Sequence, residues 1–124
     1  MLLFILFGCC KNSNTTNEQT IESIVNESLE FSFPDENGNM VSLIDERFKD
    51  KVVLVQIMGT WCPNCLDETI YYKSLFDKYN KDGLEIISVC YEVGKTQGDY
   101  ISSVKRFKER LNVDFDFVIG GGAS

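Results

Sequence analysis

The chain has 124 residues and a net charge of −7 at pH 7. This length accommodates one domain with a single hydrophobic core, and the acidic balance argues against nucleic acid as a partner, because phosphates require a basic surface. The sequence contains no histidine, which removes the usual general base and the commonest metal ligand. The five cysteines are therefore the residues whose positions say most about chemistry.

The first seven residues, MLLFILF, form an uninterrupted apolar run. The run is far shorter than the roughly 20 residues that a membrane-spanning helix requires, but it suits the apolar region of a signal peptide. It leads into the residues LFGC, which end at Cys9 and resemble the cleavage box of bacterial lipoproteins. That resemblance implies a signal segment over residues 1–10 and a lipid anchor on Cys9. The alternative is an apolar tail with two incidental cysteines.

A polar segment follows. Residues 11–20 (KNSNTTNEQT) contain no apolar side chain and are rich in Asn and Thr, as expected of a solvated tether. We therefore expect a tether over residues 11–28 and a folded domain over residues 29–124.

The start of this domain has the pattern of a β-hairpin. Apolar and polar side chains alternate over residues 29–33, which is the period of a half-buried strand. Pro34 ends that strand, and Asn37-Gly38 supplies a turn before a second apolar stretch at residues 40–43.

A strand and a helix are predicted next. Residues 51–58 (KVVLVQIM) are almost continuously apolar and rich in β-branched side chains, which predicts a central strand buried on both faces. Pro63 suits the first turn of a helix, because its missing N–H has no partner there in any case. Apolar residues then recur at helical spacing from Leu66 to Tyr79, and Gly83 is typical of a helix stop.

The remaining elements repeat this alternation. Residues 84–91 (LEIISVCY) predict a second buried strand, residues 99–111 an amphipathic helix, and residues 115–119 the start of a third strand. Strands that alternate with helices form a parallel sheet with right-handed crossovers, so the sequence predicts an α/β layer fold.

Cys62 and Cys65 are separated by two residues, directly after the first of these strands. A zinc site would need two further ligands, and Cys90 lies in mid-strand without a partner at suitable spacing. No metal is therefore expected. A structural disulfide stabilises mainly by closing a long loop, and this pair closes almost none. Redox chemistry is the interpretation that remains.

The expected position of the pair explains how it would react. A thiolate, not a thiol, attacks a disulfide. At the N-terminus of the helix, the sulfur of Cys62 meets unpaired N–H groups and the positive end of the helix dipole, which lowers its pKa. Cys65 lies about one turn further on, close enough to form a disulfide with Cys62. Cys62 would form a mixed disulfide with a substrate, which Cys65 would then resolve.

Residues 52–68 (VVLVQIMGTWCPNCLDE), with the hairpin before them, resemble the TlpA-like thiol–disulfide oxidoreductases of the thioredoxin superfamily. The resemblance implies that Cys62 is the nucleophile and Cys65 the resolving cysteine. It places Trp61 and Pro63 beside the substrate disulfide, with Trp61 as a flat wall. No cofactor is implied.

The resemblance also assigns a role to Glu68, three residues after Cys65. Many TlpA-like proteins carry an acidic residue there that manages the proton of the buried thiol. The alternative for Glu68 is a carboxylate that the helix dipole favours in the first turns. Ordinary thioredoxins keep a buried Asp at the position of Gln56, and the side chain of Gln56 cannot exchange protons.

A further departure concerns proline. The superfamily requires a cis-proline that faces the disulfide, and neither Pro34 nor Pro63 can be that residue. The expectation is thus a three-layer thioredoxin-like α/β fold with an N-terminal hairpin and a β-α-β-α-β unit. Its C-terminal hairpin and helix are missing, so we expect a truncated member of the family.

The expected function is disulfide reduction or exchange in the bacterial cell envelope. The lipid anchor would hold the protein on the periplasmic side of a membrane, where it acts on disulfide-containing proteins with electrons from a membrane donor. One alternative is a peroxiredoxin-like peroxidase, which Thr60 disfavours because it precedes Cys62 by two residues rather than three. Another is an inactive fragment that serves only as a binding module.

Overall fold

The computed structural model describes residues 30–123. The strands are β1 (Ser32–Pro34), β2 (Met40–Ser42), β3 (Val52–Met58), β4 (Leu84–Glu92) and β5 (Asp116–Gly122). The helices are α2 (Pro63–Tyr79) and α3 (Gln97–Leu111), with short 3₁₀ turns η1 (Glu46–Phe48) and η2 (Asn80–Asp82). Residues 1–28, which hold the predicted signal segment and tether, lie outside the described residues, as does Leu29 at the start of the predicted domain.

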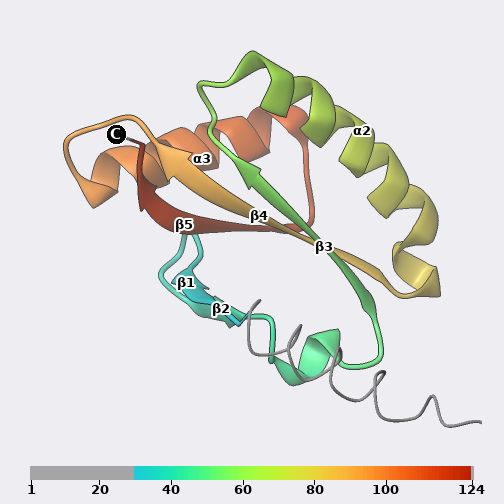
Figure 1. The fold of residues 1–124 in the computed structure, drawn as a ribbon. Helices are drawn as coiled ribbons and strands as arrows, with labels where there is room; N and C mark the ends of the chain where they lie inside the picture. Colours follow the sequence, from blue (N-terminus) through green and yellow to red (C-terminus); the bar gives the residue numbers. More distant parts are fainter. Residues whose placement is uncertain (1–29, 124) are drawn as a thin grey trace, which may run out of the picture. The chain divides into compact units, whose positions relative to one another are not determined.

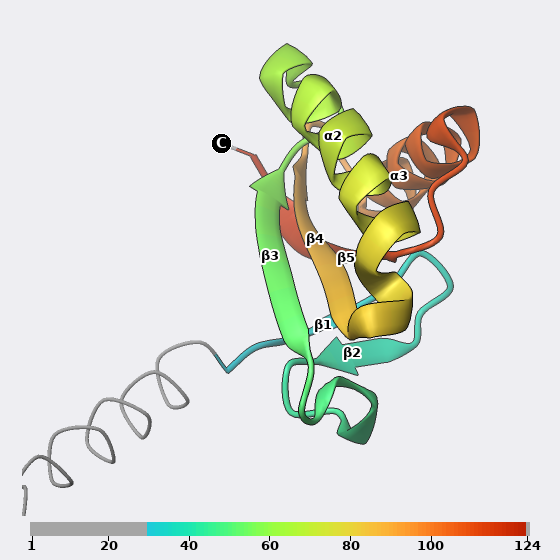
Figure 2. The same ribbon diagram turned by 90° about the vertical axis from the view of Figure 1, so that its right-hand side faces the viewer.

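The folded unit has three layers (Figure 1). Strands β3, β4 and β5 form a parallel sheet in the order β3-β4-β5, and β1 and β2 form a separate antiparallel hairpin. Helices α2 and α3 lie on the same side of the sheet (Figure 2), and the hairpin packs on the other side. The predicted α/β layer architecture, with an N-terminal hairpin followed by a β-α-β-α-β unit, is confirmed.

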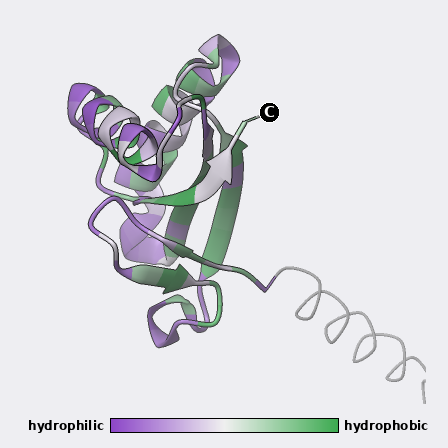
Figure 3. Ribbon diagram, turned by 90° about the vertical axis from the view of Figure 1, so that its left-hand side faces the viewer, coloured by the Kyte–Doolittle hydropathy of each residue, from purple (hydrophilic) through white to green (hydrophobic). Residues whose placement is uncertain are grey.

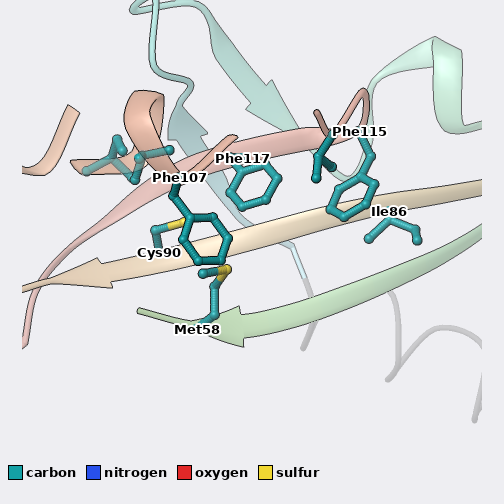
Figure 4. Close-up of a cluster of buried hydrophobic side chains, with 9 residues drawn as sticks. Met58, Ile86, Cys90, Phe107, Phe115 and Phe117 are labelled. Atoms are coloured by element: carbon teal, nitrogen blue, oxygen red, sulfur yellow. The ribbon is translucent and has the colours of Figure 1, made fainter. Parts of the chain in front are cut away.

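The main core lies between the sheet and the two helices. Phe107, Phe115 and Phe117 form its centre, with Met58 and Cys90 beside them (Figure 4). The rings of Phe115 and Phe117 stack with their centroids 5.4 Å apart. A smaller cluster on the other face joins the hairpin and η1 to the sheet through Val41, Phe48, Ile87, Val89 and Val118. Colouring by hydropathy shows this arrangement as largely hydrophobic strands between more polar outer elements (Figure 3).

The predicted strand forms over Val52–Met58, but the part of the chain that the structure describes does not cover both of its faces, which the sequence predicts to be buried. Within the described residues, β3 pairs only with β4 and lies at the edge of the sheet. Its side chains alternate: Leu54 and Met58 pack under the helices, whereas Ile57, on the other face, is 64% exposed. An apolar run reports the hydrophobicity of a strand but not the number of layers that cover it.

The structure also refines the predicted ends of the elements. Gly83 ends the α2–η2 segment with a φ of +100°, a left-handed conformation that favours glycine. Helix α3 starts two residues earlier than predicted because Thr96 and Asp99 form a capping box. Strand β5 continues beyond residue 119 to Gly122. None of the described helices is long and apolar enough to cross a membrane.

Candidate active site

Cys62 is the N-cap of α2, and Pro63 is the first residue of the helix. A tight turn joins the end of β3 to this cap, because the N–H of Cys62 donates to the carbonyl of Gly59 at 3.0 Å. The helix then closes on itself through the N–H of Leu66, which donates to the carbonyl of Cys62 at 3.2 Å. The predicted position of the pair at a helix N-terminus is confirmed.

The two cysteines are free thiols in this structure and differ in acidity. A hydrogen bond from the thiol of Cys65 lowers the pKa of Cys62, and the backbone N–H groups of Cys65 and Asn64 lower it further. The charge of Glu68 opposes this shift. Burial, followed by the hydrogen bond to Cys62, raises the pKa of Cys65. Cys62 is therefore the thiol that ionises first.

Glu68 is held beside the pair by two hydrogen bonds. The amide nitrogen of Gln56 donates to one carboxylate oxygen at 2.9 Å, and the hydroxyl of Tyr72 donates to the other at 2.7 Å. The bond to Glu68 also raises the pKa of Tyr72. Gln56 occupies the position at which ordinary thioredoxins carry a buried Asp. The side chain of Gln56 has no carboxylate of its own and instead orients the carboxylate of Glu68.

The side chain of Gln56 is itself held in place by hydrogen bonds. It is 2% exposed, and its amide oxygen accepts a hydrogen bond from the hydroxyl of Ser88 at 2.7 Å. Thr69, which is fully buried, accepts a hydrogen bond from the amide nitrogen of Gln56 at 3.2 Å and donates its hydroxyl to the carbonyl of Cys65 at 2.7 Å. Gln56, Ser88 and Thr69 thus link β3, β4 and α2, and Thr69 connects this cluster to the backbone of Cys65.

Trp61 is 57% exposed beside the cysteine pair, and its indole N–H donates to the carbonyl of Tyr91 at 3.0 Å. Next to it, Thr60 donates both its backbone N–H and its hydroxyl to the carboxylate of Glu92. Sequence reasoning missed Glu92 and Tyr72. The signal that marks Glu92 is a carboxylate at the C-terminal end of the apolar strand that includes Cys90.

Cys90 and Cys9 lie outside this pair. Cys90 is fully buried in the main core, and burial raises its pKa far above that of an ordinary thiol, which agrees with an inert apolar role. Cys9 lies outside the described residues. Within residues 30–123, no group of three or more potential ligands is placed to hold a metal ion.

A family model described as Redoxin matches residues 25–124, which is most of the chain. The chain belongs to the Redoxin family. Within it, the chain is 30% identical to the thiol-disulfide oxidoreductase ResA of Geobacillus thermodenitrificans over 119 residues. It is 33% identical to the ResA protein of Bacillus thuringiensis subsp. konkukian over 107 residues. These alignments cover 96% and 86% of this chain but only 64% and 57% of the two relatives.

Solved structures place this Redoxin protein among thioredoxin-like folds. A thiol-disulfide oxidoreductase from Bacteroides fragilis superposes with a TM-score of 0.63 at 20% identity, and the match covers 77% of this chain and 67% of that one. The thioredoxin domain of a Bacteroides vulgatus oxidoreductase superposes with a TM-score of 0.58 at 28% identity, covering 73% and 59%. The resemblance to TlpA-like proteins of the thioredoxin superfamily is thereby confirmed.

Proposed function

We propose that the protein is a thiol–disulfide oxidoreductase that reduces or exchanges disulfides in other proteins through Cys62 and Cys65. The observation that carries this proposal is the position of the pair: Cys62 is the N-cap of α2, directly after the turn that follows β3, and Cys65 lies in the first turn of the same helix. At these positions the pKa of Cys62 is lowered and burial raises the pKa of Cys65. In such a pair, the first thiol ionises more readily and attacks the substrate disulfide, and the second stays protonated until it resolves the mixed disulfide. Relatives named as oxidoreductases of this type support it.

The reaction is two successive exchanges. The thiolate of Cys62 attacks one sulfur of a substrate disulfide, the substrate S–S bond breaks, and one substrate thiolate leaves. Cys65 then loses its proton and attacks the sulfur of Cys62, which releases the second substrate thiolate. The substrate gains two electrons, and the protein is left with a Cys62–Cys65 disulfide. A membrane-bound dithiol donor would return the pair to the reduced state. Trp61 and Pro63 flank Cys62 and would contact the substrate disulfide.

The test is reduction of a protein disulfide, such as those of insulin, by the full chain with dithiothreitol as the electron source. We expect turnover well above the rate with dithiothreitol alone, and no comparable consumption of hydrogen peroxide. Peroxide consumption that exceeds disulfide reduction would instead identify a peroxidase. Absence of both activities, in protein with a cooperative urea transition, would leave a binding module.

Glu68 is proposed to accept the proton of Cys65 during the second exchange, because its carboxylate is oriented beside the pair by Gln56 and Tyr72. In Glu68→Gln, we expect turnover to fall by about 10²-fold at neutral pH, the usual contribution of a general base. The loss should shrink as the pH rises and Cys65 ionises without help. A pH–rate profile of the variant checks this, with Asp67→Asn as the control. A loss that is constant across pH would remove the proton-transfer role.

We further propose that the protein acts outside the cytoplasm, on the periplasmic side of a bacterial membrane, and is anchored there by a lipid on Cys9. The apolar run and the residues LFGC before and at Cys9 support this. On expression in bacteria, the wild-type chain should partition into membranes, and Cys9→Ala should move it to the soluble fraction. Cys10→Ala is the matched control. Unchanged partition of Cys9→Ala would contradict the anchor.

A further inference from the structure

Glu92 is a buried carboxylate at the end of β4, with only 1% of its surface exposed. One of its oxygens accepts the backbone N–H of Thr60 at 2.8 Å, and the other accepts the hydroxyl of Thr60 at 2.6 Å. No ion pair among the described residues includes it. Burying a carboxylate without a cation is unfavourable, so stability alone is a poor reason for a Glu at this position.

The residue that Glu92 holds is two positions before Cys62. The neighbouring residue of β4, Tyr91, binds the same segment, because its carbonyl accepts the indole N–H of Trp61 at 3.0 Å. The end of β4 thus makes three hydrogen bonds to two consecutive residues of the turn that leads to the nucleophile.

The packing of this turn leaves little freedom. A Cβ atom at Gly59 would collide with the indole of Trp61 and approach the carbonyl of Tyr91 to 2.8 Å. The N–H of Cys62 in turn donates to the carbonyl of Gly59. A displacement of Thr60 is therefore transmitted to Cys62, whose sulfur must stay near the backbone N–H groups of the first turn of α2.

We propose that Glu92 is a positioning residue for Cys62: its buried carboxylate clamps Thr60 and thereby holds the sulfur of Cys62 at the N-terminus of α2. This inference rests on the proposed function in one respect only: the position of Cys62 matters for turnover if the protein reduces disulfides. Its direct readout is the reactivity of Cys62, which is measurable whether or not the protein turns over a substrate. Cys65 and Glu68 are the titratable groups that act directly on this sulfur, and both are unchanged in the variants below.

The experiment measures the rate at which iodoacetamide alkylates Cys62 in the full reduced chain between pH 5 and 10, quantified on the Cys62 peptide. We expect Thr60→Val, which loses one hydrogen bond to Glu92, to react about threefold to tenfold more slowly at pH 7, with its titration midpoint moved to higher pH. Thr60→Ser keeps the hydroxyl and should stay within about twofold of the wild type.

The Glu92→Ala variant distinguishes a role of Glu92 in positioning Thr60 from an effect of its negative charge on Cys62. Removing a negative charge near a thiol by itself lowers the pKa of the thiol, whereas loss of the clamp raises it. We expect the midpoint of Cys62 to rise in Glu92→Ala, with a change in the fluorescence of Trp61, the single tryptophan of the chain. Glu85→Ala, on the same strand and paired with Lys51, is the control and should leave both signals unchanged.

A fall in the midpoint of Glu92→Ala would show that Glu92 acts through its charge and would overturn the proposal. An unchanged midpoint in Thr60→Val, together with a lower urea midpoint, would show a merely structural contact and would also overturn it. If Glu92→Ala does not fold, the comparison of Thr60→Val with Thr60→Ser decides alone.

Discussion

Cys62→Ser is expected to abolish disulfide reduction, with a loss of at least about 10³-fold in kcat/KM. A serine hydroxyl does not ionise near neutral pH, so the helix cap has no anion to stabilise and no nucleophile remains. The insulin-type assay measures the loss. Cys90→Ala is the matched control, because Cys90 is buried in the core, where burial raises its pKa. Residual activity above about one tenth of the wild type would show that another thiol attacks.

Cys65→Ser should fail differently, since the first exchange remains possible and the second does not. The variant is expected to accumulate as a mixed disulfide between Cys62 and the substrate. Non-reducing electrophoresis detects this species as a larger band that dithiothreitol removes. Failure to trap it would contradict the assignment of Cys65 as the resolving cysteine.

Phe117→Ala is expected to lower the free energy of unfolding by about 3–5 kcal/mol. The side chain is fully buried, stacks on Phe115 and lies 6.0 Å from the ring of Phe107, so its removal leaves a cavity where the sheet meets α3. Since small domains are stable by only about 5–15 kcal/mol, a loss of this size should bring the variant close to unfolding. Urea denaturation followed by circular dichroism measures the change.

The control for this variant is Val52→Ala. Val52 lies at the start of β3 and is 70% exposed, so its truncation should change the free energy of unfolding by less than about 0.5 kcal/mol. A loss below about 1 kcal/mol in Phe117→Ala would contradict the position of this ring at the centre of the core.

The features that the sequence by itself determined are local ones. Pro63 at the first helical position and Gly83 in a left-handed conformation each act within a few residues, and both lie where the sequence predicts them. The predicted hairpin also forms, but β1 begins at Ser32 and includes Pro34, which the sequence predicts to end the strand. The spacing of Cys62 and Cys65 belongs to the same class. Because Cys62 is the N-cap of a helix, the groups that lower its pKa, in Cys65 and Asn64, are its neighbours along the chain.

The tertiary structure alone decided which distant groups support this pair. Gln56 meets Ser88 because β3 and β4 pair in parallel at that register, and Glu92 reaches Thr60 across 32 positions of sequence. The exposure of Ile57 likewise depends on which elements cover the sheet. Hydrophobic periodicity reports how each segment prefers to be buried, but strand register and layer order arise from contacts between segments, and no local pattern encodes them.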